Sequence, residues 1–199
     1  ILLLFLTVQT KAGRLDVGKT YPYPNIQAAL LKAQENDSIF VHRGVYKEKN
    51  ILISKPLYLE GVEWPVLDGE YTYEVISIKA NNVTVKGFSI QQSGISSITD
   101  FAGIKVYNSK YASIINNRFF HCFFGIYIQN GTSCLIQNNL LCATNKQEQQ
   151  SGDGIHCWKS DSLHIISNSI MGHRDGIYFE FVTNSLIIKN VSGKNLRYG

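Results

Sequence analysis

One short phrase occurs four times in the chain, as Gly103-Ile104-Lys105-Val106, Gly125-Ile126-Tyr127-Ile128, Gly154-Ile155-His156-Cys157 and Gly176-Ile177-Tyr178-Phe179, and it begins again at Gly199. The intervals between successive glycines are nearly equal, except for a longer one between Gly125 and Gly154. A second phrase follows each glycine at a nearly constant distance, and it ends at Asn117, Asn138, Asn168 and Asn190. A repeat with a period of about 22 residues indicates that one supersecondary unit is stacked on copies of itself.

The repeating unit is strand-like. Each phrase is short and rich in Ile, Val, Tyr and Phe, and its apolar and polar residues alternate. Leucine-rich repeats have a similar period, but the leucines that they require at fixed positions are missing. The pattern therefore predicts an all-β, single-stranded parallel β-helix in which each coil makes two or three short strands. Like residues then stack about 4.8 Å apart. The asparagines Asn117, Asn138, Asn168 and Asn190 are expected to point inward and hydrogen-bond along the stack.

Composition sets the class of protein. The chain has 199 residues, of which 44% are hydrophobic and 17% charged, so one domain with a sizeable core is expected. The net charge of +4 and the lack of any Lys/Arg run argue against nucleic acid as a partner.

The first eight residues are an apolar run that is too short to span a bilayer. We interpret residues 1–12 as the remnant of a signal peptide and residues 13–199 as the β-helix, with a buried first strand as the alternative for the apolar run. The new coil that opens at Gly199 lacks a terminal cap, so the sequence is expected to be the N-terminal part of a longer solenoid. Export to the periplasm follows from the signal peptide.

One helix is expected, over residues 26–33, with Asn25 as its N-cap and with the function of closing the open end of the first coil. The cysteines form no CxxC pair, which disfavours a structural zinc site. Most of them, Cys157 included, are expected to be small buried hydrophobes. His164 is expected to point inward. Two loops, at residues 92–101 and 144–150, interrupt the period and are expected at the surface.

Alternation predicts which residues face outward. If the Ile after each glycine points inward, then Lys105, Tyr127, His156 and Tyr178 point to solvent. The candidate binding face consists of Asp153, Trp158, Arg174, Asp175, Tyr178 and Glu180, together with the two histidines of the same coils.

His156 and His173 lie one coil apart, and we expect them to meet at a corner, where they are candidate copper ligands because imidazole suits copper. The structural alternative is that Asp153 and Asp175 cap corner amides and that Arg174 pairs with one of them.

Two resemblances extend this interpretation. Residues 25–30 and Gly44-Val45-Tyr46 resemble the entry cap of the right-handed parallel β-helix superfamily, which is shared by carbohydrate-binding and sugar-hydrolase proteins. Residues 152–158, 172–181 and 195–199 resemble the NosD family of periplasmic maturation proteins for nitrous oxide reductase. This second resemblance implies a copper-processing accessory protein that is not an enzyme and helps to assemble a copper–sulfide centre. The implied partners are the permease and ATPase of an ABC-type transporter, and nitrous oxide reductase or a copper chaperone.

Two other functions fit the same fold. A polysaccharide lyase, epimerase or hydrolase would use the aromatic and acidic outer face as a sugar groove, with Asp153, Asp175, Glu180 and Arg174 as candidate groups. A purely structural or adhesive solenoid would have neither metal affinity nor turnover.

Overall fold

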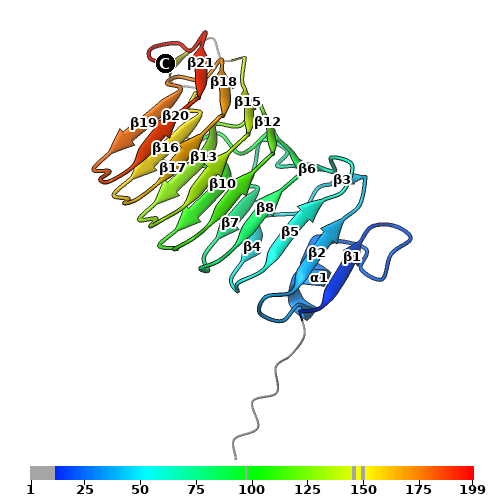
Figure 1. The fold of residues 1–199 in the computed structure, drawn as a ribbon. Coiled ribbons are helices and arrows are strands. Elements are labelled where there is room, and N and C mark those ends of the chain that lie inside the picture. The colour runs from blue at the N-terminus through cyan, green and yellow to red at the C-terminus, as the bar shows by residue number, and fades with distance from the viewer. Residues whose placement is uncertain (1–11, 97, 145–146, 149–150) are drawn as a thin grey trace, which may run out of the picture.

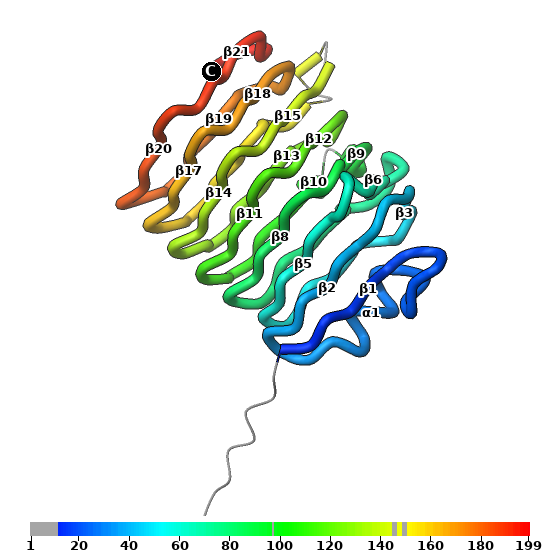
Figure 2. Tube along the Cα trace, turned by 45° about the vertical axis from the view of Figure 1, so that its right-hand side comes forward, coloured from blue at the N-terminus to red at the C-terminus, as the bar shows by residue number. Residues whose placement is uncertain are grey.

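The computed structural model describes residues 12–96, 98–144, 147–148 and 151–199. The chain is a right-handed parallel β-helix, in which successive coils stack from the N-terminal end, with α1 and β1, to the C-terminal end, with β19 to β21 (Figures 1 and 2). The fold predicted from the repeat is confirmed. Residues 1–11, which make up almost all of the predicted signal peptide, and part of the predicted loop at 144–150 lie outside the described residues.

Three parallel sheets form the wall of the β-helix. The eight-stranded sheet contains β1 (Arg14–Val17), β2 (Ser38–Val41), β5 (Tyr58–Gly61), β8 (Thr84–Lys86), β11 (Ser113–Ile115), β14 (Leu135–Gln137), β17 (His164–Ile166) and β20 (Leu186–Ile188). The six-stranded sheet contains β4 (Ile51–Ile53), β7 (Ile76–Ile78), β10 (Ala102–Tyr107), β13 (Phe124–Gln129), β16 (Ile155–Trp158) and β19 (Ile177–Glu180). The seven-stranded sheet contains β3 (Val45–Tyr46), β6 (Val66–Asp68), β9 (Ser89–Gln91), β12 (Arg118–Phe120), β15 (Leu140–Cys142), β18 (Ser169–Met171) and β21 (Val191–Gly193).

The N-terminal helix closes the first coil, as predicted. Helix α1 (Ile26–Lys32) begins after Asn25, whose side-chain oxygen accepts a hydrogen bond from the Ala28 amide at 2.8 Å. Its apolar side buries Ile26, Ala29 and Leu30 over the end of the core. Within the described ranges, no helix is long and apolar enough to cross a membrane.

The recurring glycines are required by the packing inside each coil. In the six-stranded sheet, the Ile after each glycine stacks on its equivalent and is buried, as Ile104, Ile126 and Ile155 show. A Cβ atom added to Gly125 would lie 2.5 Å from Leu141, and one added to Gly154 would lie 2.4 Å from Ile170. Large side chains of the seven-stranded sheet therefore fill the space that any other residue would need.

The asparagine ladder is present, but one of its predicted members is wrong. The buried members are Asn117, Asn139 and Asn168, and Asn190 continues the ladder. Asn138 is exposed and occupies the preceding corner position with a φ of 55°. Asn138 follows its glycine one position earlier than the other three asparagines do, and the interval becomes equal when Asn139 takes its place.

Each ladder asparagine supplies hydrogen-bond partners that buried backbone groups at the corner would otherwise lack. The side-chain oxygen of Asn139 accepts hydrogen bonds from the backbone amide of Asn117 at 2.9 Å and from its side chain at 3.2 Å. Its amide nitrogen donates to the Ile114 carbonyl at 2.8 Å. Because all of these groups are buried, the ladder fixes the corner of every coil that carries it.

Three of the four thiols belong to the hydrophobic core. All four cysteines are free, and Cys122, Cys134 and Cys157 are buried. Burial raises the pKa of the Cys122 thiol to about 12, so it stays protonated at neutral pH. The prediction for Cys157 is confirmed. The inward placement predicted for His164 is wrong, because His164 stacks between Leu135 and Leu186 on the exposed side of its sheet.

Replacing Asn139 with Ala should destabilise the β-helix by about 2–4 kcal/mol, because the buried amide of Asn117 loses its acceptor. Urea unfolding followed by circular dichroism measures this loss. Asn138→Gly is the matched control, since Gly adopts a positive φ without strain and should change stability by less than about 0.5 kcal/mol. Equal losses in the two variants would contradict the assignment of the ladder to Asn139.

Candidate functional site

The outer face of the six-stranded sheet carries one in-register row of polar and aromatic side chains. Ser77, Lys105, Tyr127, His156 and Tyr178 are directly paired from β7 to β19. Neighbouring side chains in such a row are about 4.8 Å apart and interact directly. We call this row the outer row.

Most of the outer row is shielded from solvent, in contrast to the prediction. Lys105 is 6% exposed, and Tyr127 and His156 are each 7% exposed, whereas Tyr178 is 36% exposed. The cause is a second apolar cluster outside the core, formed by Ala102, Phe124 and Tyr127, with Phe123 and Trp158 packed against it. The outer row therefore lies in a partly desolvated environment, where electrostatic interactions are stronger than in water.

Asp153 orients His156. The Nδ1 atom of His156 lies 2.7 Å from Oδ2 of Asp153, and the Asp153 side chain is completely buried. Arg174 donates to the same carboxylate through Nε at 3.1 Å and through a terminal nitrogen at 3.2 Å. A carboxylate on Nδ1 fixes the tautomer of neutral imidazole and leaves Nε2 as the group that can accept a proton or a metal.

Aromatic rings surround the imidazole of His156. Phe124 and Tyr127 make edge contacts with it at centroid distances of 5.3 and 4.5 Å, and Tyr178 stacks on it at 5.3 Å. Among the described residues, none forms a hydrogen bond with Nε2 of His156. The ring is held in one orientation with one nitrogen unoccupied.

His173 does not face the outer row. Its side chain is completely buried, and both ring nitrogens lack a hydrogen-bond partner within the described part of the chain. A Cβ atom on Gly154 would lie 3.4 Å from its ring, on the side of the core residue Ile170. The outward placement predicted for His173 is therefore wrong. His173 lies at the corner shortly before Gly176, and this corner turns its side chain inward. Cys122 occupies the equivalent place before Gly125 in an earlier coil and is also buried.

Burial lowers the pKa of His173 to about 4. In the unfolded chain its pKa is about 6.5, so between these values the unfolded state binds more protons than the folded one. The free energy of unfolding should therefore fall by about 3 kcal/mol as the pH drops from 7 to 4. Urea unfolding at several pH values measures this slope.

The variant His173→Leu isolates the contribution of the imidazole. It keeps a buried apolar side chain of similar size, so its stability should fall less over the same pH range. Parallel pH profiles for the variant and the wild type would show that His173 is not the titrating group.

Asp175 repeats the arrangement of Asp153 one coil further along. Its buried carboxylate accepts hydrogen bonds from Nε and a terminal nitrogen of Arg197 and from the Tyr198 amide. Burial alone would raise the pKa of Asp175, but the hydrogen bond and charge of Arg197 outweigh that effect and lower it. The structural alternative is confirmed in two parts, since Arg174 pairs with Asp153 and Asp175 accepts the Tyr198 amide. The pairing of Arg197 with Asp175 was not predicted.

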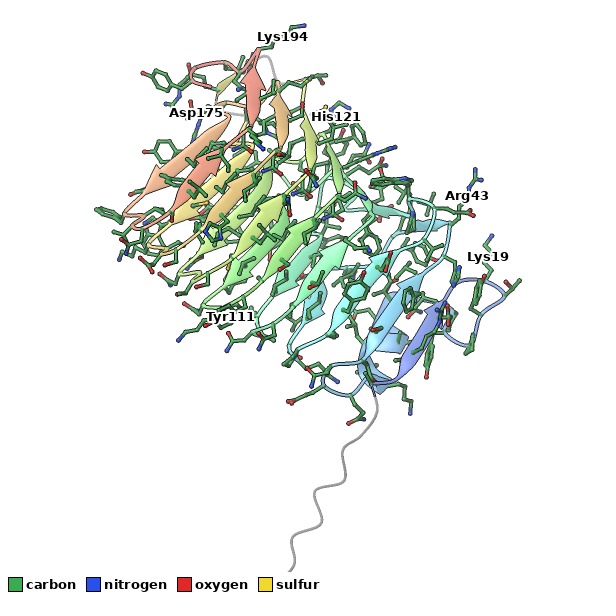
Figure 3. All side chains as sticks on the ribbon, in the orientation of Figure 1. Lys19, Arg43, Tyr111, His121, Asp175 and Lys194 are labelled. Carbon is green, nitrogen blue, oxygen red and sulfur yellow. The ribbon has the colours of Figure 1, made fainter. Side chains whose placement is uncertain are left out.

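The remaining residues of the predicted binding face lie at its C-terminal end. Trp158 is paired with Glu180 in the next coil, and the ammonium group of Lys159 lies 4.4 Å from its ring centroid. Tyr178 covers one side of His156. Asp175 is labelled near this end in Figure 3.

The sequence interpretation missed a cluster of titratable groups at the other end of the outer row. The Glu74 carboxyl is buried and contacts the Ser77 hydroxyl, and the Tyr107 hydroxyl lies 3.1 and 3.0 Å from its two oxygens. The Lys105 ammonium lies 4.3 Å from the ring centroid of Tyr127 and donates to the Asp100 carbonyl at 3.2 Å.

Burial raises the pKa of Glu74 and lowers that of Lys105, so both groups are shifted toward their neutral forms. Shifted carboxyl and amine groups close to one another are typical of functional sites. The sequence gives little indication of this cluster, because Glu74 belongs to an early coil that lacks the recurring glycine phrase.

A complete metal site is not formed by the described residues alone. Across residues 12–96, 98–144, 147–148 and 151–199, no group of three or more His, Cys, Asp and Glu side chains is arranged to hold a metal ion. His156 offers one imidazole nitrogen.

Comparison with known proteins supports the fold. The family model described as "Right handed beta helix region" matches residues 102–199. No curated protein matches the sequence significantly. Among solved structures, a pectin methylesterase in complex with a hexasaccharide is similar, with a TM-score of 0.50 and 15% identity over 85% of this chain and 67% of the other.

Two further structures are similar. The ORF18 protein of Geobacillus virus E2 has a TM-score of 0.55 and 13% identity over 85% of this chain, which spans 39% of the viral protein. A rhamnogalacturonan lyase has a TM-score of 0.49 and 10% identity over 87% of this chain and 62% of its own. At 13–15% identity, the similarity to the pectin methylesterase and to the viral protein supports the parallel β-helix fold and no activity. None of these comparisons names a copper-maturation protein.

Proposed function

We propose that the chain is an exported accessory protein for the assembly of the copper–sulfide centre of nitrous oxide reductase, and that it works with an ABC-type transporter. The observation that carries the proposal is the contact between Asp153 and His156 at 2.7 Å. A carboxylate that hydrogen-bonds one nitrogen of an imidazole is typical of histidines that bind a metal through the other. His156 lies in the first of the coils that resemble the NosD family.

In this proposal copper is cargo. Nε2 of His156 supplies one neutral imidazole ligand, which suits copper. The surrounding rings of Phe124, Tyr127 and Tyr178 exclude water from one side and leave the remaining ligands to a partner. The partner is nitrous oxide reductase or a copper chaperone in the periplasm, and the permease and ATPase of the transporter are the other proteins of the system.

Replacing His156 with Ala should weaken copper binding about 100-fold or more, because the imidazole ligand is lost. Asp153→Asn should weaken it by about 10- to 100-fold through loss of the orienting charge. Competition with a chromophoric chelator for Cu(I) and Cu(II) measures both changes.

Two histidine variants serve as controls. His121→Ala removes an exposed imidazole elsewhere on the surface (Figure 3), and His173→Leu removes the buried one, so neither should change copper affinity. If copper binds and His173→Leu weakens it as much as His156→Ala, the paired-histidine site predicted from the sequence is favoured instead. Absence of copper binding by the folded chain would contradict the proposal.

A carbohydrate-active enzyme is the second candidate, because Glu74, Lys105 and Tyr107 form a desolvated acid–base cluster on the same face. A uronate lyase needs a base that removes the proton next to the carboxyl group, and an amine with a lowered pKa can act in that way. The fold also accommodates sugar chains, since the similar pectin methylesterase was solved with a hexasaccharide.

If the second candidate is correct, acidic polysaccharides should develop new ultraviolet absorbance from the double bond that β-elimination leaves. Lys105→Gln, which removes the proposed base, should lower this rate by about 100-fold or more. Lys189→Gln, which changes an exposed lysine, should leave it unchanged. No absorbance with any acidic polysaccharide would leave the copper proposal as the better account of the outer row.

A further inference from the structure

A separate pocket lies at the N-terminal end of the β-helix, away from the outer row. It has a volume of about 630 Å³ and lies between residues 18–24 and residues 42–46. Its lining includes Lys19, Thr20, Tyr21, His42, Arg43 and Tyr46. Pockets of this volume are typical of small-molecule sites.

Several contacts hold the wall of the pocket in place. His42 and Tyr21 stack with their ring centroids 3.7 Å apart and an interplanar angle of 7°. Nε2 of His42 lies 2.7 Å from Oδ1 of Asp16, whose carboxylate is also held by Arg14 at 2.8 and 2.9 Å. The Tyr46 hydroxyl donates to the His42 carbonyl at 2.8 Å.

These contacts fix the hydrogen-bonding role of His42. A neutral imidazole that donates from Nε2 to Asp16 has Nδ1 as an acceptor. No hydrogen bond to Nδ1 is formed among the residues that the structure describes. The flat imidazole ring of His42 therefore lines the pocket in an orientation held by Asp16 and Tyr21.

Two cations line the same pocket. Lys19 and Arg43 are exposed, and neither forms an ion pair with any described carboxylate. Figure 3 shows both side chains at the N-terminal end of the molecule. Asp16 does not neutralise them, since Arg14 and His42 already occupy its oxygens. The pocket thus combines two positive charges that have no ion-pair partner among the described carboxylates with the flat imidazole ring of His42.

We propose that this pocket binds a small anionic sugar, with its acidic group between Lys19 and Arg43 and a hydroxyl group donating to Nδ1 of His42. Carboxylate and phosphate share the chemistry that an arginine fork and a lysine recognise. A hydroxyl group is the complement of the imidazole acceptor. The pocket is independent of the copper and lyase proposals, because none of its lining residues belongs to the outer row.

The test is isothermal titration calorimetry of the folded chain with D-galacturonate and with glucose 6-phosphate, and with glucose as the neutral probe. Either anion should bind at least tenfold more tightly than glucose, and the stronger of the two identifies the acidic group. The double variant Lys19→Gln, Arg43→Gln should lower that affinity at least tenfold. His42→Phe, which keeps the stacked ring and removes the acceptor, should lower it severalfold.

Lys189→Gln is the matched control, because it removes one exposed positive charge at the far end of the β-helix and should leave the affinity unchanged. The proposal is overturned if neither anion binds, or if Lys189→Gln weakens binding as much as the double variant does. It is also overturned if inorganic phosphate binds as tightly as glucose 6-phosphate and His42→Phe has no effect, because the site would then not recognise a sugar.

Discussion

The in-register stacking of equivalent residues is the constraint on which the rest of the structure depends. Parallel hydrogen bonds between coils place Ile126 over Ile155, and Tyr127 over His156. Because side chains alternate along a strand, a slip of one position would exchange the core with the surface. The asparagine ladder and the glycines that face Leu141 and Ile170 both resist such a slip. The same in-register stacking therefore stabilises the core and aligns the side chains of the outer row.

The outer row shows how a regular wall can hold an irregular set of polar groups. A charged or polar side chain in the apolar core would be costly, whereas the outward positions of a coil are only partly desolvated and offer polar neighbours. The residues Phe123 and Phe124 then cover part of the row and lower its exposure to water. The buried carboxylates of Asp153 and Asp175 persist there because each has an arginine from the next coil. The charge of one coil is thus balanced by its neighbour.

The sequence predicts the architecture of the chain, but it does not predict how deeply the residues of the candidate site are buried. Periodicity predicted the parallel β-helix, the capping helix and the register of Lys105, Tyr127, His156 and Tyr178. It did not predict that Lys105 and His156 are buried, since their cover comes from side chains that have no repeat. The prediction for His173 fails because alternation holds within strands and not at corners. The prediction of Asn138 in place of Asn139 fails because two adjacent asparagines occur at a corner where only one can point inward.

The parallel stack also gives the molecule a constant length increment for each coil. Adding or removing one coil moves every later coil by about 4.8 Å along the axis and leaves the contacts within each remaining coil unchanged. The spacing between the N-terminal pocket and His156 is therefore set by a whole number of coils. Gene duplication or deletion of single repeats would change the reach of the protein in equal steps, without the need to redesign either end.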